Sequence, residues 1–524
     1  IRMSGLLYVP RNATADAPTP GILAVHGYIN SRETQDGFAI ALARAGYVVL
    51  ALDQTGHGYS GGVVAENGYG GPDGLSYLRS LPMVDKNNIG LEGHSMGGWA
   101  VLEAAAAEPD AYRAMVLEGS ATGVKIGRAL ASPEGDARFP KNLAVVYSRY
   151  DEFALLMWGV SRAWDVAKSP KLMALFGSGG PVATGRLYGT IDKGDARILY
   201  APVTTHPGDH ISPEAINDAV QWFGLTLRGA KAPGDSLWIW KEVGTAAAFV
   251  GAICVMLGAF ALFLSFPALC VLAMPARPSR ERRDRAWWIW LAATALIPAL
   301  SFYPFMLFGA LALPPSRFFP QSITNQVMAW ALLNGGIAAI SLVWRKGSKT
   351  GSSGNWPAST AIAILTVGMA YLALALTDYL FKVDFRFWVV ALKLLSGRQF
   401  LWFLAYLIPF TIAFIASLNG IARLMVKGDS TVTQYVLGLT AFAGGFLLFV
   451  IAQYAPLFIR GALLVPQEAL NAIISLQFVP LLAVIAVPTV FTWRRTNSVL
   501  PGALIAGLFV SWYVVAGTAV QYGS

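Results

Sequence analysis

The sequence predicts a molecule in two parts, an α/β domain with a mostly parallel sheet followed by an all-α domain of several transmembrane helices. Up to about residue 230, short apolar strands alternate with amphipathic stretches, which is typical of helices packed on both faces of a parallel sheet. Residues 242–524 consist of apolar runs, each near the ~20 residues that a helix needs to cross a bilayer. Residues 231–241 are expected to link the two parts.

Seven short apolar runs in residues 1–230 predict buried strands. They are Gly5–Val9, Gly21–Val25, Val48–Leu52, Ile89–Glu92, Ala114–Glu118, Leu143–Tyr147 and Arg197–Ala201. Helices are predicted at Gly37–Ala45, Gly71–Leu81, Gly97–Ala107 and Pro213–Leu227. Active sites of such sheets form at the carboxyl ends of the strands, so reactive side chains are expected there.

The stretch Gly93-His94-Ser95-Met96-Gly97 matches the pattern G-x-S-x-G, which holds a nucleophilic serine on a sharp turn between a strand and a helix. The apolar strand NIGLEG precedes the serine and the helix GGWAVLEAAAA follows it. Glycines let the backbone pack tightly around a serine in a strained conformation. A serine in an ordinary glycine-rich loop is the alternative. The context favours Ser95 as a nucleophile on a turn formed with Gly93, His94 and Gly97.

A nucleophilic serine needs a base, and the base needs an acid that orients it. On a strand–turn–helix scaffold the chain order is Ser, then Asp or Glu, then His. His206 follows the predicted strand RILYAP and is the expected base, with His210 as the alternative base. Asp151 follows the predicted strand NLAVVY and is the expected acid, with Glu152 and Asp136 as alternatives.

An oxyanion hole requires two backbone N–H donors. The residue after the nucleophile, Met96, is expected to supply one donor. Tyr28 is expected to supply the other, because it follows a strand that ends at Val25 and a turn through His26 and Gly27. The ring and hydroxyl of Tyr28 either contact substrate or pack within the domain, and both roles stay open.

Several motifs together resemble the α/β-hydrolase superfamily, in particular its dienelactone-hydrolase, serine-aminopeptidase and acyl-peptidase-like branches. They are HGY at 26–28, ALDQTGHGYSGG at 51–62, GLEGHSMGG at 90–98, YDEF at 150–153 and the late histidine. The resemblance covers about residues 1–228. It implies an eight-stranded, mostly parallel sheet and Ser-His-Asp hydrolysis through an acyl-enzyme. It also implies a structural role, at the rim of the site, for the loop that contains Asp53 and His57.

The stretch between Asp151 and His206 is longer than one helix and one strand require. Residues 152–195 are rich in Leu, Met, Trp and Phe, and we interpret them as a lid over the site or a surface that faces the bilayer. Additional core helices are the alternative. Because such an insert would control specificity, the resemblance does not supply the substrate.

Eight transmembrane helices are predicted in the second part. The spans are 243–274, 286–312, 326–344, 358–378, 399–421, 432–455, 469–492 and 499–520. Residues 379–398 are predicted to form an interfacial helix, because Lys382, Arg386 and Lys393 fall on one helical face and apolar side chains on the other. An ordinary amphipathic connector is the alternative.

Positive charges predict the orientation of the spans. The segments between spans carry twelve Lys and Arg residues on one side and six on the other. Short loops rich in Lys and Arg stay in the cytoplasm, so the first part is expected on the extracytoplasmic side of the cell membrane. Export requires a signal peptide or an anchor helix. None precedes Ile1, so we expect an upstream anchor that would bring the spans to nine.

Other features exclude several classes of function. The net charge of +9 arises mainly at span ends, so no nucleic acid is expected as a partner. Cys254 and Cys270 lie in one apolar run, about 24 Å apart along a helix, and cannot pair. The sequence contains no metal-type Cys/His cluster, and we expect neither a metal nor a cofactor. The span interiors hold few ionisable residues, which favours an anchor or scaffold over a transporter.

These observations predict a membrane-anchored serine hydrolase that cleaves ester or amide bonds outside the cytoplasm. Attachment to the bilayer favours an apolar or lipid-like substrate. The expected partners are membrane lipids and a small ester, lipid or peptide substrate, and the membrane domain could also mediate a homo-oligomer. A peptidase for small peptides, an acyltransferase with the same residues, and a non-catalytic sensor or transport partner are the alternatives.

Overall fold

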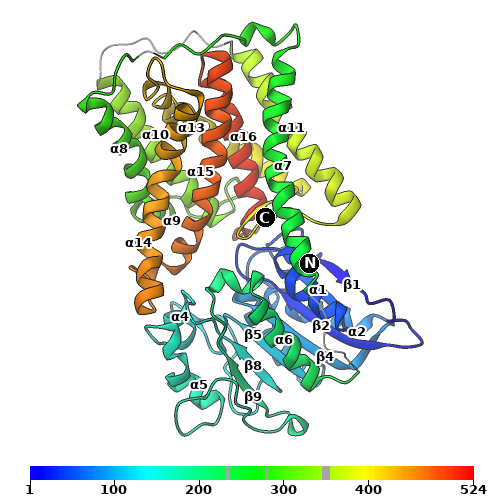
Figure 1. Cartoon of the computed structure of the whole chain (residues 1–524). Helices are drawn as coiled ribbons and strands as arrows, with labels where there is room; N and C mark the ends of the chain where they lie inside the picture. The colour runs from blue at the N-terminus through cyan, green and yellow to red at the C-terminus, as the bar shows by residue number, and fades with distance from the viewer. Residues whose placement is uncertain (230–235, 279, 345–354, 524) are drawn as a thin grey trace. The chain divides into compact units, whose positions relative to one another are not determined.

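A computed structural model describes residues 1–229, 236–278, 280–344 and 355–523, and the chain divides into two compact units (Figure 1). The first unit comprises Ile1–Gly244, Gln453–Ala469 and Ala519–Gly523. The second comprises Thr245–Ala452 and Leu470–Thr518. Residues 231–235 of the linker predicted at 231–241 lie outside the described residues, and so do residues 345–354 between the predicted spans 326–344 and 358–378.

A seven-stranded sheet forms the centre of the first unit. Its strands are β1 (Ser4–Tyr8), β2 (Thr19–Val25), β3 (Val48–Asp53), β4 (Val84–His94), β5 (Ala114–Glu118), β8 (Leu143–Val146) and β9 (Arg197–Tyr200). The order across the sheet is β1-β3-β2-β4-β5-β8-β9. Only the pairing of β1 with β3 is antiparallel. All seven predicted strands are therefore confirmed, and the mostly parallel sheet with them.

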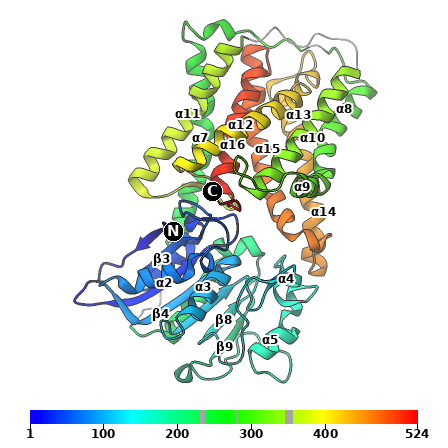
Figure 2. The same cartoon turned by 180° about the vertical axis from the view of Figure 1, so that it is seen from behind.

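Helices cover both faces of this sheet. Helices α1 (Asp36–Arg44) and α6 (Pro213–Thr226) lie on the face toward the viewer in Figure 1. Helices α2 (Gly71–Ser80) and α3 (Met96–Ala107) lie on the opposite face, seen from behind in Figure 2. Each strand contributes side chains to the core on both faces of the sheet, because successive side chains point to opposite faces. In β2, Leu23 packs in the core beneath α2 and α3, whereas Ile22 packs in the core beneath α1 and α6.

The sheet has one strand fewer than the eight that the resemblance implies. The outermost strand, β1, pairs with β3 alone among the described residues and forms one edge. At the other edge, β9 pairs with β8. A hairpin of β6 (Lys125–Ile126) and β7 (Ala129–Leu130) is separate from the main sheet, and all four of these strand residues are exposed.

The predicted lid at residues 152–195 contributes large side chains to the core and leaves others exposed. It forms α4 (Ala154–Trp158), η3 (Ala163–Lys168), α5 (Pro170–Leu175) and η4 (Ile191–Lys193). Large side chains such as Trp158 and Leu172 are buried in the same apolar cluster as strands β5 and β8. The buried side chains match the alternative of additional core helices, while a lid formed by the exposed ones stays a prediction.

Two segments far along the chain also belong to the first unit, although the sequence assigns them to the membrane domain. In Ala519–Gly523, the N–H of Val520 donates to the carbonyl of Gly56, and the Val520 carbonyl accepts from Val64, both at 2.9 Å. In Gln453–Ala469, Gly461 packs so closely on Trp164 that an added Cβ would lie 2.7 Å from the indole ring. Local hydrophobicity gives no sign of such packing.

Helices make up most of the second unit. They are α8 (Arg285–Leu300), α9 (Phe302–Ala312), α10 (Ser322–Trp344), α11 (Trp356–Phe381), α12 (Gly397–Leu418), α13 (Thr431–Leu439) and α16 (Leu500–Gly517). Helices α7 (Trp238–Leu264), α14 (Gly445–Arg460) and α15 (Ala469–Thr496) cross a boundary between the units.

Among the described residues, six helices are long and apolar enough to cross a membrane, and a bent pair would make a seventh. The pair is α8 with α9, which meet at an angle of 49° close to Pro298. The eighth predicted span, 326–344, is helical as part of α10 but is not among these helices. This span borders residues that lie outside the described part of the chain, so the count of eight spans stays a prediction.

The predicted interfacial helix at 379–398 is wrong. Helix α11 continues to Phe381, and a hairpin of β10 (Phe385–Phe387) and β11 (Val390–Leu392) follows. Arg386 is buried and pairs with Asp384 at 2.5 Å instead of facing solvent. The chain leaves the helix at Lys382, which adopts a left-handed conformation with φ +55°. Alternating side chains then suit a short strand better than a helical face.

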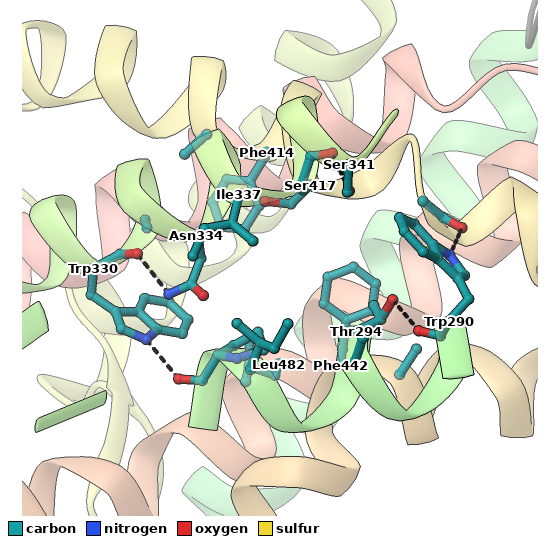
Figure 3. Close-up of a pocket in the computed structure, with 18 residues that line it drawn as sticks. Trp290, Thr294, Trp330, Asn334, Ile337, Ser341, Phe414, Ser417, Phe442 and Leu482 are labelled. Atoms are coloured by element: carbon teal, nitrogen blue, oxygen red, sulfur yellow. Dashed lines mark hydrogen bonds between the residues drawn. The ribbon is translucent and has the colours of Figure 1, made fainter. Parts of the chain in front are cut away.

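A cavity of about 140 Å³ lies within the second unit, among α8, α10, α12, α15 and the π-helical turn Thr440–Gly444 (Figure 3). Its polar side chains include Thr294 and Asn334, which bond to the backbone carbonyls of Trp290 and Trp330. None of the lining side chains is charged. The cavity therefore lacks the ionisable groups that mark ion pathways.

Candidate active site

Ser95 stands on a sharp turn between β4 and α3. Its backbone angles, φ +55° and ψ −121°, lie in a region that only strained non-glycine residues occupy. A Cβ on Gly97 would lie 2.0 Å from the carbonyl oxygen of Val25, and one on Gly93 would lie 2.3 Å from that of Gly97. Both positions therefore require glycine, as predicted for a nucleophile turn.

Glu118 at the end of β5 and Ser120 just after it hold this turn in place. The backbone N–H of Ser95 donates to the carbonyl of Glu118 at 2.7 Å. The Ser120 hydroxyl donates to the carbonyl of Ser95, also at 2.7 Å. The sequence did not single out either residue, since both act on the backbone of the serine from a neighbouring strand. Together they fix the strained conformation.

His206 and Asp151 form a buried pair at the carboxyl ends of β9 and β8. Nδ1 of His206 lies 2.7 Å from Oδ2 of Asp151. The other carboxylate oxygen, Oδ1, accepts from the N–H of Phe153 at 2.7 Å and from the hydroxyl of Tyr147 at 3.0 Å. These donors fix the carboxylate, which in turn orients the imidazole with Nδ1 as its donor.

The surroundings of His206 favour its protonated form. Burial acts to lower the pKa of His206, but the carboxylate of Asp151, with those of Glu152 and Asp209 behind it, outweighs burial and raises that pKa above its ordinary value. The ring of Phe153 lies edge-on to the imidazole at 4.7 Å and excludes water from one side. A histidine with this electrostatic support stabilises the positive charge that a general base acquires.

The alternatives for base and acid occupy other places. The ring of His210 lies 4.0 Å from that of His94 and 6.5 Å from that of Phe38. Glu152 accepts the backbone N–H of His206 at 2.9 Å and does not bond to its ring. Asp136 is exposed and accepts N–H groups of its own loop. The hydrogen bond to Asp151 thus favours His206 over His210.

The serine turn and the loop with His206 are in contact through residues next to Ser95 and next to Glu118. Nε2 of His94 bonds to the backbone carbonyl of His206 at 3.0 Å, and the two rings lie 4.6 Å apart. Gly119 follows Glu118, whose carbonyl accepts the N–H of Ser95. A Cβ added at Gly119 would lie 2.7 Å from Nδ1 of His206. Residues 95, 151 and 206 thus lie together at the carboxyl ends of the parallel strands.

The predicted oxyanion-hole residues also lie at the carboxyl ends of the strands, beside Ser95. Met96 is the first residue of α3, directly after Ser95. A Cβ on Gly27 would lie 3.1 Å from Cβ of Ser95, so the loop with Tyr28 packs against the serine. The hydroxyl of Tyr28 accepts from the side-chain amide of Gln521 at 2.6 Å. Burial raises the pKa of Tyr28 to about 12, so its phenol stays neutral near pH 7.

A second polar network lies beneath the serine turn. The carboxylate of Asp209 accepts from the Ser148 hydroxyl and lies 3.6 Å from Nε2 of His94. Burial lowers the pKa of His94, and the nearby His206 lowers it further. The motif predicts His94 in the serine turn but predicts no partner for its ring. Asp209, which lies between His206 and His210 in the sequence, is the residue that could have indicated this network.

The loop with Asp53 and His57 makes contacts within the domain, as a structural role would require. The carboxylate of Asp53 accepts backbone N–H groups of Arg32 at 2.9 Å and Tyr59 at 3.1 Å. The ring of His57 packs against that of Tyr28 at 5.8 Å. Across the described parts of the chain, no group of three or more His, Cys, Asp or Glu residues is placed to hold a metal ion.

Residues 16–144 match the family model of serine aminopeptidase, S33. A protein of Mycobacterium phage D29 that is named as a non-heme haloperoxidase is 32% identical over 102 residues, which are 20% of this chain and 36% of that protein. The chain thus spans about a third of that relative's length.

Among solved structures, Est1E from Butyrivibrio proteoclasticus, with ferulic acid bound, is 17% identical. The match covers 43% of this chain and 95% of Est1E, with a TM-score of 0.29. Dienelactone hydrolase from Anabaena variabilis is 19% identical, over 44% of this chain and 94% of that enzyme, also with a TM-score of 0.29. The family match, the sheet order and the turn at Ser95 identify the N-terminal part of this chain as an α/β-hydrolase domain.

Proposed function

We propose that this protein is a serine hydrolase that cleaves carboxylic ester or amide bonds through an acyl-enzyme on Ser95. The observation that carries the proposal is the buried hydrogen bond of 2.7 Å between His206 and Asp151, beside a serine held at φ +55°. Each of these features has a cost in free energy, from burial of charge or from backbone strain. Buried charges and strained residues of this kind cluster at the active sites of enzymes, which supports the proposal.

In the proposed mechanism, Oγ of Ser95 attacks the carbonyl carbon of the substrate while Nε2 of His206 takes the hydroxyl proton. The oxyanion that forms accepts hydrogen bonds from the backbone N–H groups of Met96 and Tyr28. The protonated His206 then gives its proton to the leaving alcohol or amine, and an ester on Ser95 remains. Water attacks this ester with His206 again as base, which releases the acid and restores the serine.

We further propose an apolar or lipid-like acyl substrate, met at a membrane on the extracytoplasmic side. Support comes from the six helices of the described residues that are apolar enough to span a membrane, and from apolar side chains close to the reacting groups. Phe153 contacts His206. It precedes α4, whose Leu155 and Leu156 are 46% and 41% exposed. Exposed leucines beside an active site suit an acyl chain better than a charged substrate.

Hydrolysis of amides in small peptides is the second candidate. The description of the matching family, a serine aminopeptidase, favours it. The same three side chains attack both kinds of bond, so the chemistry at Ser95 does not separate the candidates. Initial rates with p-nitrophenyl esters of increasing acyl length, measured beside rates with aminoacyl amides, would separate them. A rate that rises with acyl length supports the first candidate, and preference for aminoacyl amides contradicts it.

Labelling with a fluorophosphonate tests the nucleophile, because this probe reacts with activated serines. The wild-type protein should be labelled, and Ser95→Ala should abolish the label. Ser80→Ala is the matched control, since Ser80 is exposed and bonds only within its own turn. Labelling that persists in Ser95→Ala would contradict the assignment.

A further inference from the structure

We propose that Tyr454 is a positioning residue for His206 and acts on it through the side chain of Glu152. The inference rests on the proposed function, since it concerns the histidine that would act as base. Tyr454 belongs to the segment Gln453–Ala469 of the first unit. It also lies in Thr431–Arg460, one of the stretches apolar enough to cross a membrane. A helix expected to serve only as an anchor would therefore take part in ordering the active site.

The carboxylate of Glu152 connects the two residues directly. Its Oε1 accepts the hydroxyl hydrogen of Tyr454 at 2.9 Å, and its Oε2 accepts the backbone N–H of His206, also at 2.9 Å. Glu152 is 5% exposed and Tyr454 is 6% exposed. A carboxylate this deeply buried needs donors for both oxygens, so loss of either donor is costly.

Aromatic packing supports the same contact. Phe458 lies one helical turn after Tyr454, and its ring meets that of Tyr150 edge-on at 5.2 Å. Tyr150 directly precedes Asp151, and its N–H donates to the carbonyl of Thr204 at 3.0 Å. The end of α14 therefore packs against the segment that carries the acid and is bonded to the segment that carries the base.

Tyr454→Phe isolates the hydroxyl. The phenyl ring keeps the packing, while Oε1 of Glu152 loses this donor. Burial, followed by the charge of Asp151, raises the pKa of Glu152 to about 7, and the Tyr454 hydroxyl counteracts that rise. Without the hydroxyl, Glu152 is neutral over a wider pH range. Its charge helps to raise the pKa of His206, so that pKa should fall in the variant.

Other titratable groups around Glu152 stay unchanged in this variant. They are Asp151 and Tyr147 from the end of β8, His206 and Asp209 from η5 (His206–Ile211), and His94 from β4. A shift of the pH profile can therefore be assigned to Glu152. A residue with a purely structural role would lower activity at every pH and leave the profile in place.

The experiment uses the full chain in detergent or nanodiscs and measures kcat and KM for a p-nitrophenyl ester between about pH 5 and 9. In Tyr454→Phe, kcat should fall roughly tenfold, as for loss of one hydrogen bond to a charged group, with little change in KM. The acidic limb of kcat/KM should move to lower pH. Tyr379→Phe is the matched control, because Tyr379 is 75% exposed on α11; its kinetics should match those of the wild type.

A double-mutant cycle tests the route through Glu152. Tyr454→Phe should add little to the loss caused by Glu152→Ala, because residues that act through one another are not additive. Additive losses would overturn the inference, and so would wild-type kinetics in Tyr454→Phe. Loss of both fluorophosphonate labelling and cooperative unfolding in that variant would show a role in stability alone and would also overturn it.

Fluorophosphonate labelling separates the two claims. If the wild type is labelled at Ser95 but Tyr454→Phe behaves like Tyr379→Phe, the positioning role fails and the proposed function stands. If neither the wild type nor any variant is labelled or hydrolyses an ester, the proposed function fails and the positioning role fails with it.

Discussion

At the scale of single residues, the proposed reacting groups come from strand ends far apart in the chain, and side chains and carbonyls of neighbouring segments hold them in place. Ser95, Asp151 and His206 follow from the motif, the strand ends and the chain order. Glu118 and Glu152 support them through backbone bonds, and such bonds depend on which strands become neighbours. Nothing in the local sequence records that proximity.

Gly97→Ala tests whether the turn requires glycine. The new Cβ would meet the carbonyl oxygen of Val25 at 2.0 Å, so the backbone must shift. We expect a loss of about 1–3 kcal/mol in the free energy of unfolding, and loss of fluorophosphonate labelling. Gly224→Ala in α6 is the control, since nothing lies within 4 Å of its Cβ position; it should keep labelling and gain about 0.5–1 kcal/mol. Normal labelling in Gly97→Ala would contradict the turn.

Asp151→Asn tests the orientation of His206. An amide can present its N–H₂ group to Nδ1 and so hold the ring in the wrong tautomer. The expected kcat falls by roughly 10³–10⁴-fold, with the substrate affinity little changed. Steady-state kinetics on an activated ester provide the measurement. Loss of less than tenfold would point to another acid, and Glu152→Gln would then be the next variant to compare.

A buried carboxyl pair beneath the serine turn predicts how stability depends on pH. Burial raises the pKa of Glu92 to about 7, and burial together with the charge of Glu92 raises that of Glu118 well above its ordinary value. The folded state therefore holds more protons than the unfolded state above about pH 4.5, and stability falls as pH rises through about 7.

Glu92→Gln should remove much of this dependence, because its amide accepts from Gln35 and donates to Glu118 without any charge. Pulse proteolysis at about pH 5.5 and pH 8 measures the free energy of unfolding in each protein. The wild type should be less stable at the higher pH, and the variant should differ less between the two. Equal slopes in both proteins would contradict a raised pKa for this pair.

At the scale of elements, period and length predicted most helices and strands but misread residues 379–398. Their charge pattern predicts a helix, yet Phe385–Leu392 form a hairpin in which Arg386 is buried and pairs with Asp384. Residues 152–195 place some apolar side chains in the core and leave others exposed, because apolar composition alone does not distinguish a cover from a core. Charge and composition along the chain do not record which side chains become buried.

Gly445→Ala tests packing between helices of the second unit. Gly445 begins α14, and an added Cβ would lie 1.8 Å from the carbonyl oxygen of Ala295 in α8. Small residues let membrane helices approach this closely. The unfolding temperature in detergent should fall by several degrees, as for about 1–3 kcal/mol of overpacking. Gly368→Ala has no atom within 4 Å of its new Cβ and should leave the temperature unchanged. Equal behaviour of the two variants would contradict the contact.

At the scale of the whole molecule, the division into an α/β domain and a helical domain could be predicted from composition. The return of Gln453–Ala469 and Ala519–Gly523 to the first unit could not. Their apolar sequences suit a membrane, and their partners, Glu152 and Gly56, are more than 300 residues earlier in the chain. Sequence patterns of short range carry no such information.

Chemical labelling tests the expected side of the membrane. Cys254 and Cys270 are replaced by Ser, and Tyr77→Cys then offers a thiol at an exposed site of the first unit. A membrane-impermeant maleimide added to intact cells should label this protein. Labelling only after the cells are opened would place the first unit in the cytoplasm and contradict the orientation.

The central claim is that Ser95 carries an acyl group during turnover, and peptide mass spectrometry tests it most directly. The full chain is mixed with an activated ester, quenched in acid and digested. The account predicts the mass of the acyl group on the peptide that contains Ser95 in the wild type, and none in Ser95→Ala or His206→Ala. An acyl group on another residue, or turnover that survives in Ser95→Ala, would contradict the account.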